Sequence, residues 1–474
     1  MSNWAAMRAR MRGETVSPAV PSPSPPARVD DRPSARTTDA RAPSSSKRRR
    51  DATSSAREAA ARATVERRDG LLDARPARGD EDAMRRARES HAGTSAVSLV
   101  SATAAAALAN AEASRLRAVS RGCARFQRAC EKRLGKRWCS AYEEWLATAD
   151  AKAPLLPRGE SSRAFLAGKL RANGASDGEA DTTCASMMSM MEECARAVEC
   201  ECASASESAR VEKTREGDVV LLGLGKTTVR LNREHFDKLR ALYEASSGVI
   251  ESARDETTFL LASYAVVARY DAAQGGQFRF AGGHHTALHG DVFDVLRDAF
   301  GVSCELFASP LNCRWPRYCS RYFDVDGPFG SLGDYSRFRP SRGSYEVNPP
   351  FDENVVVDTA NHLISCLESA SDALTFVVIT PYWINRPCWE IMARSSFCSH
   401  VEVIDVREHG YYEGAQHRKA SKYRRATSDT SVIFLQTSRA RETNAVTAEK
   451  IELMREAFRP KTDVSSSRKK KKKS

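Results

Sequence analysis

Four consecutive residues, Asn348-Pro349-Pro350-Phe351, combine groups that suit the recognition of an amine on an aromatic base. The side-chain oxygen of Asn348 and the carbonyl of Pro349 can accept the two N–H bonds of an exocyclic base amine, and Phe351 can stack on the base. Such an amine is a poor nucleophile because its lone pair is delocalised into the ring, so holding it in place favours its reaction. The alternative is an ordinary turn that ends a strand.

These four residues follow a short predicted strand, Gly343–Val347. Two prolines cannot donate hydrogen bonds to a β-ladder, so the strand must end at Pro349. Ligands bind beyond the carboxyl ends of the strands in open α/β sheets. The sequence therefore places Asn348 and Phe351 where a ligand is expected.

A second candidate segment follows another predicted strand, Cys304–Phe307. We expect Ala308-Ser309-Pro310-Leu311-Asn312, together with Phe307, to form a loop beside a cofactor, and Asp326 or Glu305 to bind ribose hydroxyls. The alternative is that these two carboxylates only cap turns. His284, His285 and His289 are spaced like metal ligands but lack a carboxylate partner. We expect no metal there and interpret the histidines as part of a loop that lines the cofactor site.

From about residue 251 the sequence alternates between helical and apolar extended patterns, which indicates an α/β domain. The predicted helices cover residues 259–268, 292–300 and 354–369, and the predicted strands cover 277–281, 304–307, 343–347, 375–380, 401–406 and 431–435. A polar segment, 409–425, is too long for an ordinary connector and is a candidate substrate loop. This order of elements fits a class I methyltransferase sheet, in which S-adenosylmethionine lies across the carboxyl ends of the early strands.

The preceding part, residues 96–250, is predicted to be a helical domain with a hairpin at 218–231. Apolar residues recur at three- and four-residue spacings: Phe126, Cys130, Leu134, Trp138, Tyr142 and Trp145. The other face of this stretch is basic: Arg121, Arg125, Arg128, Lys132, Arg133, Lys136 and Arg137. We interpret it as a core helix with a solvated face, and the alternative is a helix that faces nucleic-acid phosphates.

Both ends of the chain are predicted to be basic tails. Residues 1–95 have few large apolar side chains, which favours disorder, and residues 441–474 are expected to form a helix (448–458) and a tail. The basic runs 47–50 and 468–473 are either nuclear import signals or solvated tails that bind polyanions. The predicted domains are therefore 1–95, 96–250, a methyltransferase domain at 251–440, and 441–474.

The composition narrows the function classes. A net charge of +12 favours a polyanionic partner such as nucleic acid. Thirteen cysteines without a regular spacing indicate a reducing compartment, and the lack of a secretory signal or a long apolar run predicts no membrane association. Gly225-Lys226-Thr227 resembles the end of a nucleotide-binding P-loop, but Val220 stands where that loop requires glycine, which excludes this class.

The block from Phe300 to Phe351 resembles the phosphorylated-CTD-interacting factor family, whose members are cap-specific adenosine N6-methyltransferases. The resemblance rests on Phe300-Gly301-Val302-Ser303, Phe307-Ala308-Ser309-Pro310-Leu311-Asn312-Cys313, Tyr318-Cys319-Ser320, Asp326-Gly327, Phe329-Gly330-Ser331 and Asn348-Pro349-Pro350-Phe351. Weaker matches follow as far as Phe434-Leu435-Gln436, so the resemblance covers about residues 282–436.

The resemblance implies methyl transfer from S-adenosylmethionine to N6 of the adenosine that follows a 7-methylguanosine cap, usually a 2′-O-methyladenosine. It assigns catalysis to Asn348-Pro349-Pro350-Phe351 and substrate or cofactor contact to Glu353 and Trp383. The expected partner is capped mRNA, the expected location is the nucleus, and the expected state is a monomer. Alternatives are an N6-adenine methyltransferase acting on DNA or internal RNA sites, and a non-catalytic RNA-binding scaffold.

One family feature is expected to be missing. Animal members carry an N-terminal WW module, which needs two suitably spaced tryptophans in a β-sheet context. Trp4 stands alone, and Trp138 and Trp145 lie in a helical pattern. We therefore expect that the chain lacks the module, which argues against binding to the RNA polymerase II machinery.

Overall fold

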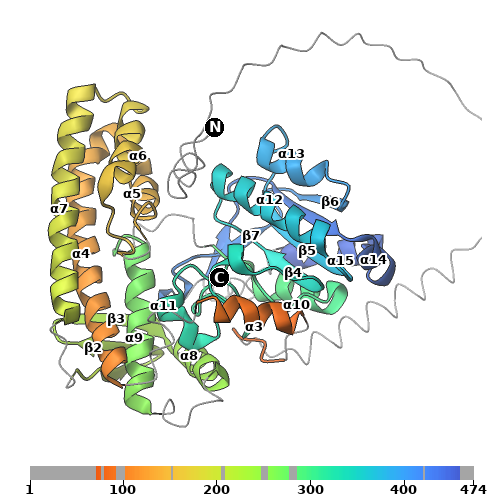
Figure 1. Cartoon of the computed structure of the whole chain (residues 1–474), viewed down its shortest axis with the longest axis horizontal. Helices are drawn as coiled ribbons and strands as arrows, with labels where there is room; N and C mark the ends of the chain where they lie inside the picture. Colours follow the sequence, from red (N-terminus) through yellow and green to blue (C-terminus); the bar gives the residue numbers. More distant parts are fainter. Residues whose placement is uncertain are drawn as a thin grey trace, which may run out of the picture. The chain divides into compact units, whose positions relative to one another are not determined.

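A computed structural model of the chain describes residues 71–75, 79–91, 102–150, 153–203, 209–246, 255–276, 286–419 and 422–459 (Figure 1). All of them belong to one compact unit, Leu71–Ser474. The predicted strand 277–281, His284, His285 and both basic runs lie outside the described residues.

A helix occupies part of the segment that the composition assigned to a disordered tail. Helix α3 (Glu81–Glu89) is capped by Asp80, whose side chain accepts a hydrogen bond from the Ala83 amide. Its buried face packs beside Tyr345, and the Asp80 amide donates to the Tyr345 hydroxyl over 3.0 Å. The composition could not reveal this helix because its few apolar residues are buried by a distant strand and not by one another.

Helices dominate the described residues between 102 and 203. They are α4 (Ala102–Leu134), η2 (Gly135–Arg137), α5 (Trp138–Leu146), α6 (Gly159–Arg171) and α7 (Asp177–Ala203). Helix α4 packs along both α7 and α9 (Glu256–Ala273). The predicted apolar stripe is confirmed: its six residues are buried, and the Phe126 and Trp145 rings stack with centroids 5.8 Å apart.

A three-stranded antiparallel sheet follows these helices. It contains β1 (Glu212–Glu216), β2 (Val219–Leu224) and β3 (Thr227–Asn232), and α8 (Arg233–Ser246) continues from it. The predicted hairpin is confirmed as β2 and β3. Strand β1 was missed because all five of its residues are exposed, so it has no apolar alternation.

The larger sheet is mixed. Its order is β4-β5-β9-β6, and the strands are β4 (Gly343–Val347), β5 (Leu374–Pro381), β9 (Thr430–Gln436) and β6 (Cys398–Ile404). Strand β4 runs parallel to β5, whereas β9 is antiparallel to both β5 and β6. On the other side of β4, single parallel bridges join Glu346 to Glu305, Glu305 to Tyr318, and Tyr318 to Ser331. The strand predicted at 304–307 is thus present only as this bridge.

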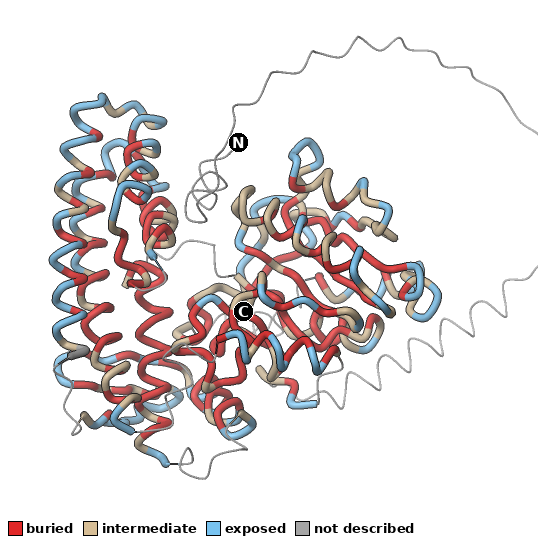
Figure 2. Tube along the Cα trace, viewed as in Figure 1, coloured by how far each residue is buried: buried red, intermediate tan, exposed pale blue. Residues whose placement is uncertain are grey.

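Helices cover both faces of this sheet. Val377 and Ile379 of β5 pack with α10 (Gly290–Phe300) and α15 (Ala448–Phe458), whereas Phe376 and Val378 pack with α12 (Glu353–Ser369) and α13 (Pro387–Ala393). Figure 2 shows the central strands buried along their length. This double burial explains why β5 is an unbroken apolar run.

The remaining elements connect these layers. They are α11 (Phe323–Asp326), η5 (Gly327–Phe329), η6 (Tyr335–Arg337), β7 (Gly410–Tyr412), η7 (Gln416–Arg418), β8 (Tyr423–Arg425) and α14 (Ser438–Thr443). The candidate substrate loop 409–425 therefore begins and ends with the short paired strands β7 and β8. None of the described helices has both the length and the apolar character that a bilayer span requires.

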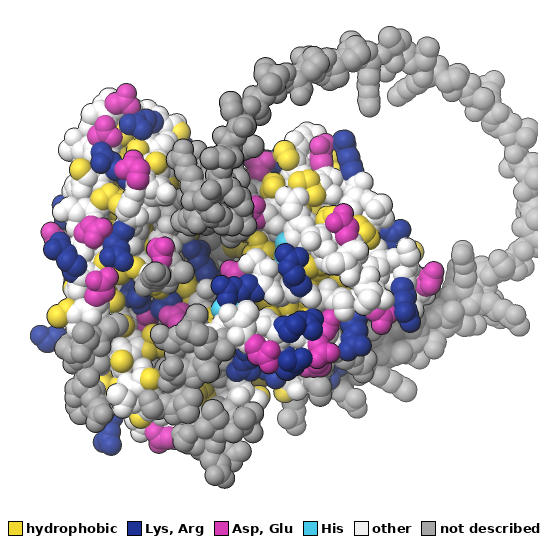
Figure 3. Space-filling model, in the orientation of Figure 1, with side chains coloured by type: hydrophobic (Ala, Val, Ile, Leu, Met, Phe, Trp, Pro, Cys, Tyr) yellow, Lys and Arg dark blue, Asp and Glu magenta, His cyan; other side chains and the backbone are white. Residues whose placement is uncertain are grey.

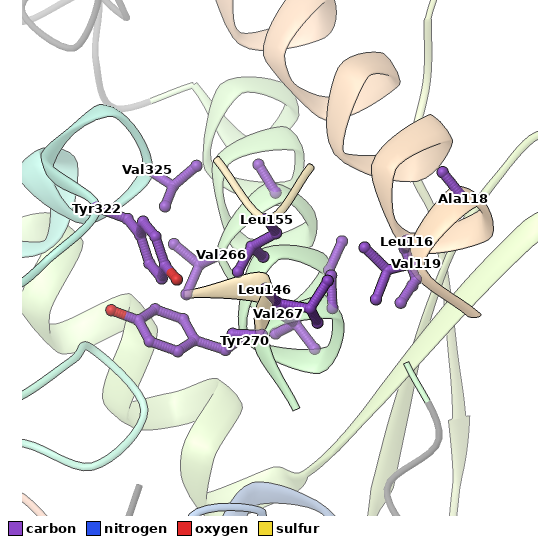
Figure 4. Close-up of a cluster of buried hydrophobic side chains, with 14 of the residues drawn as sticks. Leu116, Ala118, Val119, Leu146, Leu155, Val266, Val267, Tyr270, Tyr322 and Val325 are labelled. Carbon is purple, nitrogen blue, oxygen red and sulfur yellow. The ribbon is translucent and has the colours of Figure 1, made fainter. Parts of the chain in front are cut away.

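Helix α9 connects the helical part to the segment before β4. Figure 4 shows Tyr322 and Val325 on one side of α9, near Val266 and Tyr270, and Leu116 and Val119 of α4 on the other side. One continuous core cluster therefore contains residues from both sides of the predicted domain boundary at residue 250.

Candidate active site

The Asn348–Phe351 segment leaves the sheet at the carboxyl end of β4. Tyr345, Glu346 and Val347 are buried and fix the strand, and the chain turns at Pro350, whose carbonyl accepts the Asp352 amide over 2.7 Å. Asp352 then caps α12 by accepting the amides of Asn354 and Val355. A capped helix thus begins directly after the segment and holds it in place.

Two polar acceptors of this segment have no hydrogen-bond partner among the described residues. The Asn348 side chain is half-buried, and within the described residues neither its amide nor the Pro349 carbonyl oxygen makes a hydrogen bond. Pro349 is buried and Pro350 is exposed. Two acceptors therefore remain available at the end of β4.

The Phe351 ring is half-buried and is supported from behind. It packs against the core cluster of α10 and α15 and meets the Tyr411 ring edge to face, with centroids 6.1 Å apart. The Tyr411 hydroxyl lies 2.6 Å from Thr430 Oγ1, which His409 Nε2 also approaches to 2.8 Å. Tyr411 is buried, so it supports Phe351 and does not offer a free aromatic face.

The loop that begins at Phe307 leaves the sheet beside Asn348. The Leu306 amide donates to the Glu346 carbonyl over 2.9 Å, so the two parallel segments end at the same edge. Phe307 and Ala308 are half-buried, and the Phe307 ring contacts the Tyr335 ring at 4.4 Å. The structure thus brings together the first residues of the predicted cofactor loop and the Asn348 segment.

The rest of that loop closes on itself. Asn312 Oδ1 accepts the Ser309 amide and hydroxyl over 2.7 and 2.8 Å, which forms a tight turn. Ser309, Pro310 and Leu311 are buried, and Leu311 belongs to the core shared by α4 and α9. Their predicted role in cofactor binding stays a prediction.

Glu305 and Glu346 form a buried carboxyl pair beneath the site. They occupy paired positions on adjacent parallel segments, and Glu305 accepts the amides of Arg314 and Trp315 over 2.7 and 3.3 Å. Burial raises the pKa of Glu305 to about 7, and burial together with Glu305 raises the pKa of Glu346 well above its usual range. The pair therefore carries less than two negative charges at neutral pH, and Glu305 orders the loop that follows it.

Sequence reasoning did not assign a role to Glu346. The signal was present, because Glu346 stands between the apolar residues Tyr345 and Val347 of a predicted strand. Isolated charges are rarely buried, so such a position indicates a special environment.

Asp326 lies inside the molecule. Its side chain accepts a hydrogen bond from the Tyr270 hydroxyl over 2.8 Å, and its second oxygen, Oδ1, is buried without a hydrogen-bond partner. Burial raises the pKa of Asp326 to about 7. A buried acceptor without a donor is costly, so this atom is a candidate for a hydroxyl of a bound ligand.

Glu353 and Trp383 are brought together by one arginine. Arg386 forms an ion pair with Glu353, and its guanidinium lies 5.2 Å from the centroid of the Trp383 ring. The other aromatic residues of this region, Tyr382 and Trp389, pack edge to face at 5.8 Å. The two predicted substrate residues therefore form one surface through Arg386.

Histidines do not form a metal cluster in the part of the chain that the structure describes. No group of three or more His, Cys, Asp or Glu side chains there is arranged to hold a metal ion. His289 lies near the rings of Tyr412 and Tyr423, at 6.0 and 6.2 Å.

Comparison with known proteins gives a matching family model and several relatives, among them a human and a mouse protein. The family model described as "Phosphorylated CTD interacting factor 1 WW domain" matches residues 238–414. A human protein named mRNA (2′-O-methyladenosine-N(6)-)-methyltransferase is 35% identical over 260 residues, which cover 54% of this chain and 36% of the relative. The mouse protein of the same name is 37% identical over 237 residues, covering 49% of this chain and 33% of the relative. The matched region thus spans about a third of each relative.

The expectation that the chain lacks the family's WW module is wrong, because the matching family model is the one described as the WW domain. The matched residues contain helices and strands from α8 to β7. A search for two tryptophans in a small β-sheet could not detect such a segment.

The motifs from Phe307 to Phe351 fall inside this matched region. Residues 238–414 of the chain are therefore similar to the phosphorylated-CTD-interacting factor family.

Proposed function

We propose that the chain transfers a methyl group from S-adenosylmethionine to N6 of the adenosine next to the 7-methylguanosine cap of mRNA, an adenosine that carries a 2′-O-methyl group. The observation that supports this most is the open amide of Asn348 at the end of β4, beside the half-buried ring of Phe351. The names of the human and mouse relatives supply the substrate.

The fold proposed for this activity is a class I, Rossmann-like methyltransferase domain at about 251–440, preceded by a helical domain at 96–250. The order of neighbouring segments across the sheet supports it. Bridges at Ser331, Tyr318 and Glu305 lead to β4, and β5, β9 and β6 follow on the other side. In that fold the chain crosses over between parallel strands and an antiparallel strand lies near one edge, as β9 does here. The carboxyl ends of the Glu305 segment and β4 would then form the cofactor site.

The residues at this edge suit S-adenosylmethionine. The half-buried Phe307 ring can contact an adenine, and the orphaned Asp326 Oδ1 can accept a hydroxyl. When bound, the cofactor supplies an electrophilic methyl group. The chain's own part is to hold the target amine beside it.

Asn348 and Pro349 have defined tasks in this mechanism. The Asn348 side-chain oxygen and the Pro349 carbonyl accept the two N–H bonds of adenine N6, which fixes the amine and spreads its developing positive charge. Phe351 stacks on the base, and Tyr411 keeps that ring in position. Alignment of this kind supplies several kcal/mol of barrier reduction, and the alkylated nitrogen releases its proton without a strong base.

Substrate recognition is proposed for the surface formed by Glu353 and Trp383. A capped guanine is cationic, and an aromatic face or a carboxylate suits a cation. Arg386 holds both residues in the described structure. We further propose a nuclear location, and the matched WW-domain model supports contact with the RNA polymerase II machinery.

Two other functions compete with this one. An N6-adenine methyltransferase acting on DNA or internal RNA sites would use the same Asn348 segment, and a non-catalytic RNA-binding scaffold would not use it. The test is to incubate the chain with S-adenosylmethionine and capped RNA beginning in adenosine, the same RNA without a cap, or adenine-containing DNA, followed by nucleoside mass spectrometry. N6-methyladenosine in the capped RNA alone supports the proposal. Equal product on uncapped RNA or DNA supports the first alternative, and no product on any substrate supports the second.

A further inference from the structure

Helix α4 carries two kinds of arginine. Arg115, Arg117 and Arg133 form ion pairs with Glu112, Glu201 and Glu179 respectively. Arg121, Arg125 and Arg128 are exposed and have no carboxylate partner among the residues that the structure describes. Figure 3 shows basic and acidic side chains interspersed over the helical part, which makes an uncompensated group of three notable.

These three arginines share one face of α4 because their spacing is four and then three residues. They line a groove of about 470 Å³ between α4 and α7. The floor of the groove is made by the buried side chains of Met190 and Cys194. Arg125 is held in place by a 2.7 Å hydrogen bond to the Ser186 hydroxyl. Glu193 is the one carboxylate on the lining.

We propose that this groove binds the backbone phosphates of an RNA strand. Guanidinium groups match phosphate geometry and are weakly hydrated, so they are suited to this contact. At 1.5 Å per residue, positions 121 to 128 span about 10 Å along the helix. That length corresponds to about three stacked nucleotides of one strand.

The three arginines of the groove support binding of phosphate groups. That these phosphates belong to RNA rests on the proposed function. An ordinary solvated face would pair its arginines, as α4 does at its other positions. The groove would hold the transcript beyond the cap-adjacent nucleotide, so it would affect the binding of long RNA and leave the chemistry at Asn348 unchanged.

The experiment measures binding of the full chain to fluorescently labelled capped RNA, long or only a few nucleotides in length, in the absence of cofactor. The test variant is Arg121→Ala/Arg125→Ala/Arg128→Ala. The matched control is Arg158→Ala/Arg163→Ala/Arg171→Ala, which removes the same charge from arginines that are paired with Glu199, Asp181 and Asp177. Five of the six positions are helical, where alanine is favourable, and Arg158 precedes α6 without a side-chain cap hydrogen bond, so both variants are expected to fold, which circular dichroism checks.

We expect the test variant to bind long RNA at least tenfold more weakly than the control does, with no difference on the short RNA. The slope of log affinity against log salt should be shallower by about 2, since each single-strand phosphate contact contributes about 0.7. Glu193→Gln should act in the opposite direction and strengthen binding of long RNA. Equal affinities of the two triple variants, or an unchanged salt slope, would overturn the proposal.

Failure of this inference is distinguishable from failure of the proposed function. If the chain binds long RNA through the groove but methylates nothing, the groove stands and the methyltransferase proposal fails. If capped RNA is methylated and the test variant binds long RNA as the unchanged chain does, the groove proposal fails alone.

Discussion

The rings of Phe351 and Tyr411 meet edge to face, with centroids 6.1 Å apart and planes at 73°. Phe351 belongs to the segment that follows β4, and Tyr411 belongs to β7, which lies 60 residues further along the chain. The Tyr411 hydroxyl is tied to Thr430 of β9. The surface on which the base is proposed to stack is therefore set by two other strands.

Replacement of Tyr411 tests this support. Tyr411→Leu removes the edge-to-face contact, which contributes about 1 kcal/mol, so KM for capped RNA should rise roughly fivefold. Tyr411→Phe keeps the ring and loses only the hydrogen bond to Thr430, so its KM should remain near that of the unchanged chain. Steady-state kinetics of both variants check this. Equal effects of the two substitutions on KM would contradict the role of the ring.

Arg269 is predicted to be essential for stability. It is 1% exposed and binds Glu112 of α4 and Asp324 of α11 over 2.7 and 2.6 Å. Arg269→Ala would remove one of the two arginines that pair with the buried Glu112, together with the ion pair of Asp324, so the unfolding free energy should fall by about 3–5 kcal/mol. Urea unfolding measures this. Arg117→Ala is the control, since its half-exposed pair with Glu201 should contribute less than about 1 kcal/mol. Similar losses in both variants would contradict the prediction.

Asp326 should make stability fall as pH rises. Burial raises the pKa of Asp326 from 3.8 to about 7, so between these values the folded state holds a proton that the unfolded chain has released. The contribution of Asp326 to the unfolding free energy is fully present below about pH 4. It is lost as the pH rises towards 7, by at most about 1.4 kcal/mol per pH unit. Asp326→Asn keeps an acceptor for Tyr270 and removes the titration. The unfolding free energy of the unchanged chain, relative to this variant, should decrease from pH 5 to pH 7.

Asp324, two residues before Asp326, serves as a control because its pKa shift has the opposite sign. Burial opposes its ionisation, but the guanidinium of Arg269 outweighs burial, and the pKa of Asp324 is lowered. Its contribution to stability is present above its ordinary pKa and is lost as pH falls. Relative to Asp324→Asn, the unchanged chain should therefore lose stability on acidification. The same sign of pH dependence at Asp324 and Asp326 would contradict the assignment.

Much of the fold could be predicted from local patterns. The apolar runs became β5, β6 and β9, and the amphipathic pattern near residue 354 became α12, since burial on one or both faces determines those residue types. The apolar patterns could not predict whether neighbouring strands run parallel or antiparallel. Strand β9 is antiparallel to its neighbours, and nothing in its seven buried residues indicates this.

Elements without an apolar signal were missed. Strand β1 is polar throughout, with four charged residues out of five. The segment around Glu305 was predicted as a strand, but single bridges hold it in place of a regular ladder. Helix α3 depends on contact with Tyr345, which is more than 250 residues away in sequence. Such contacts are properties of the folded chain and leave no periodic trace.

Only the part of the candidate site that depends on local sequence could be predicted. Asn348 and Phe351 were found because prolines force a strand to end beside them. The support by Tyr411 and Thr430 and the carboxyl pair of Glu305 and Glu346 arise from strand neighbours, which only the structure reveals. The predicted cofactor residues Leu311 and Asp326 are buried in the structure, where packing partners decide their surroundings.

The most direct test of the central claim compares the unchanged chain with Asn348→Ala in methyl transfer to capped RNA that begins in 2′-O-methyladenosine. The Asn348 side chain is half-buried and makes no hydrogen bond within the described residues, so the variant should fold normally, with an unchanged melting temperature. Loss of an acceptor that stabilises charge developing on N6 should lower kcat by a factor on the order of 100 to 1,000. A folded Asn348→Ala variant that methylates N6 at a rate close to that of the unchanged chain would contradict the claim that Asn348 holds the reacting amine.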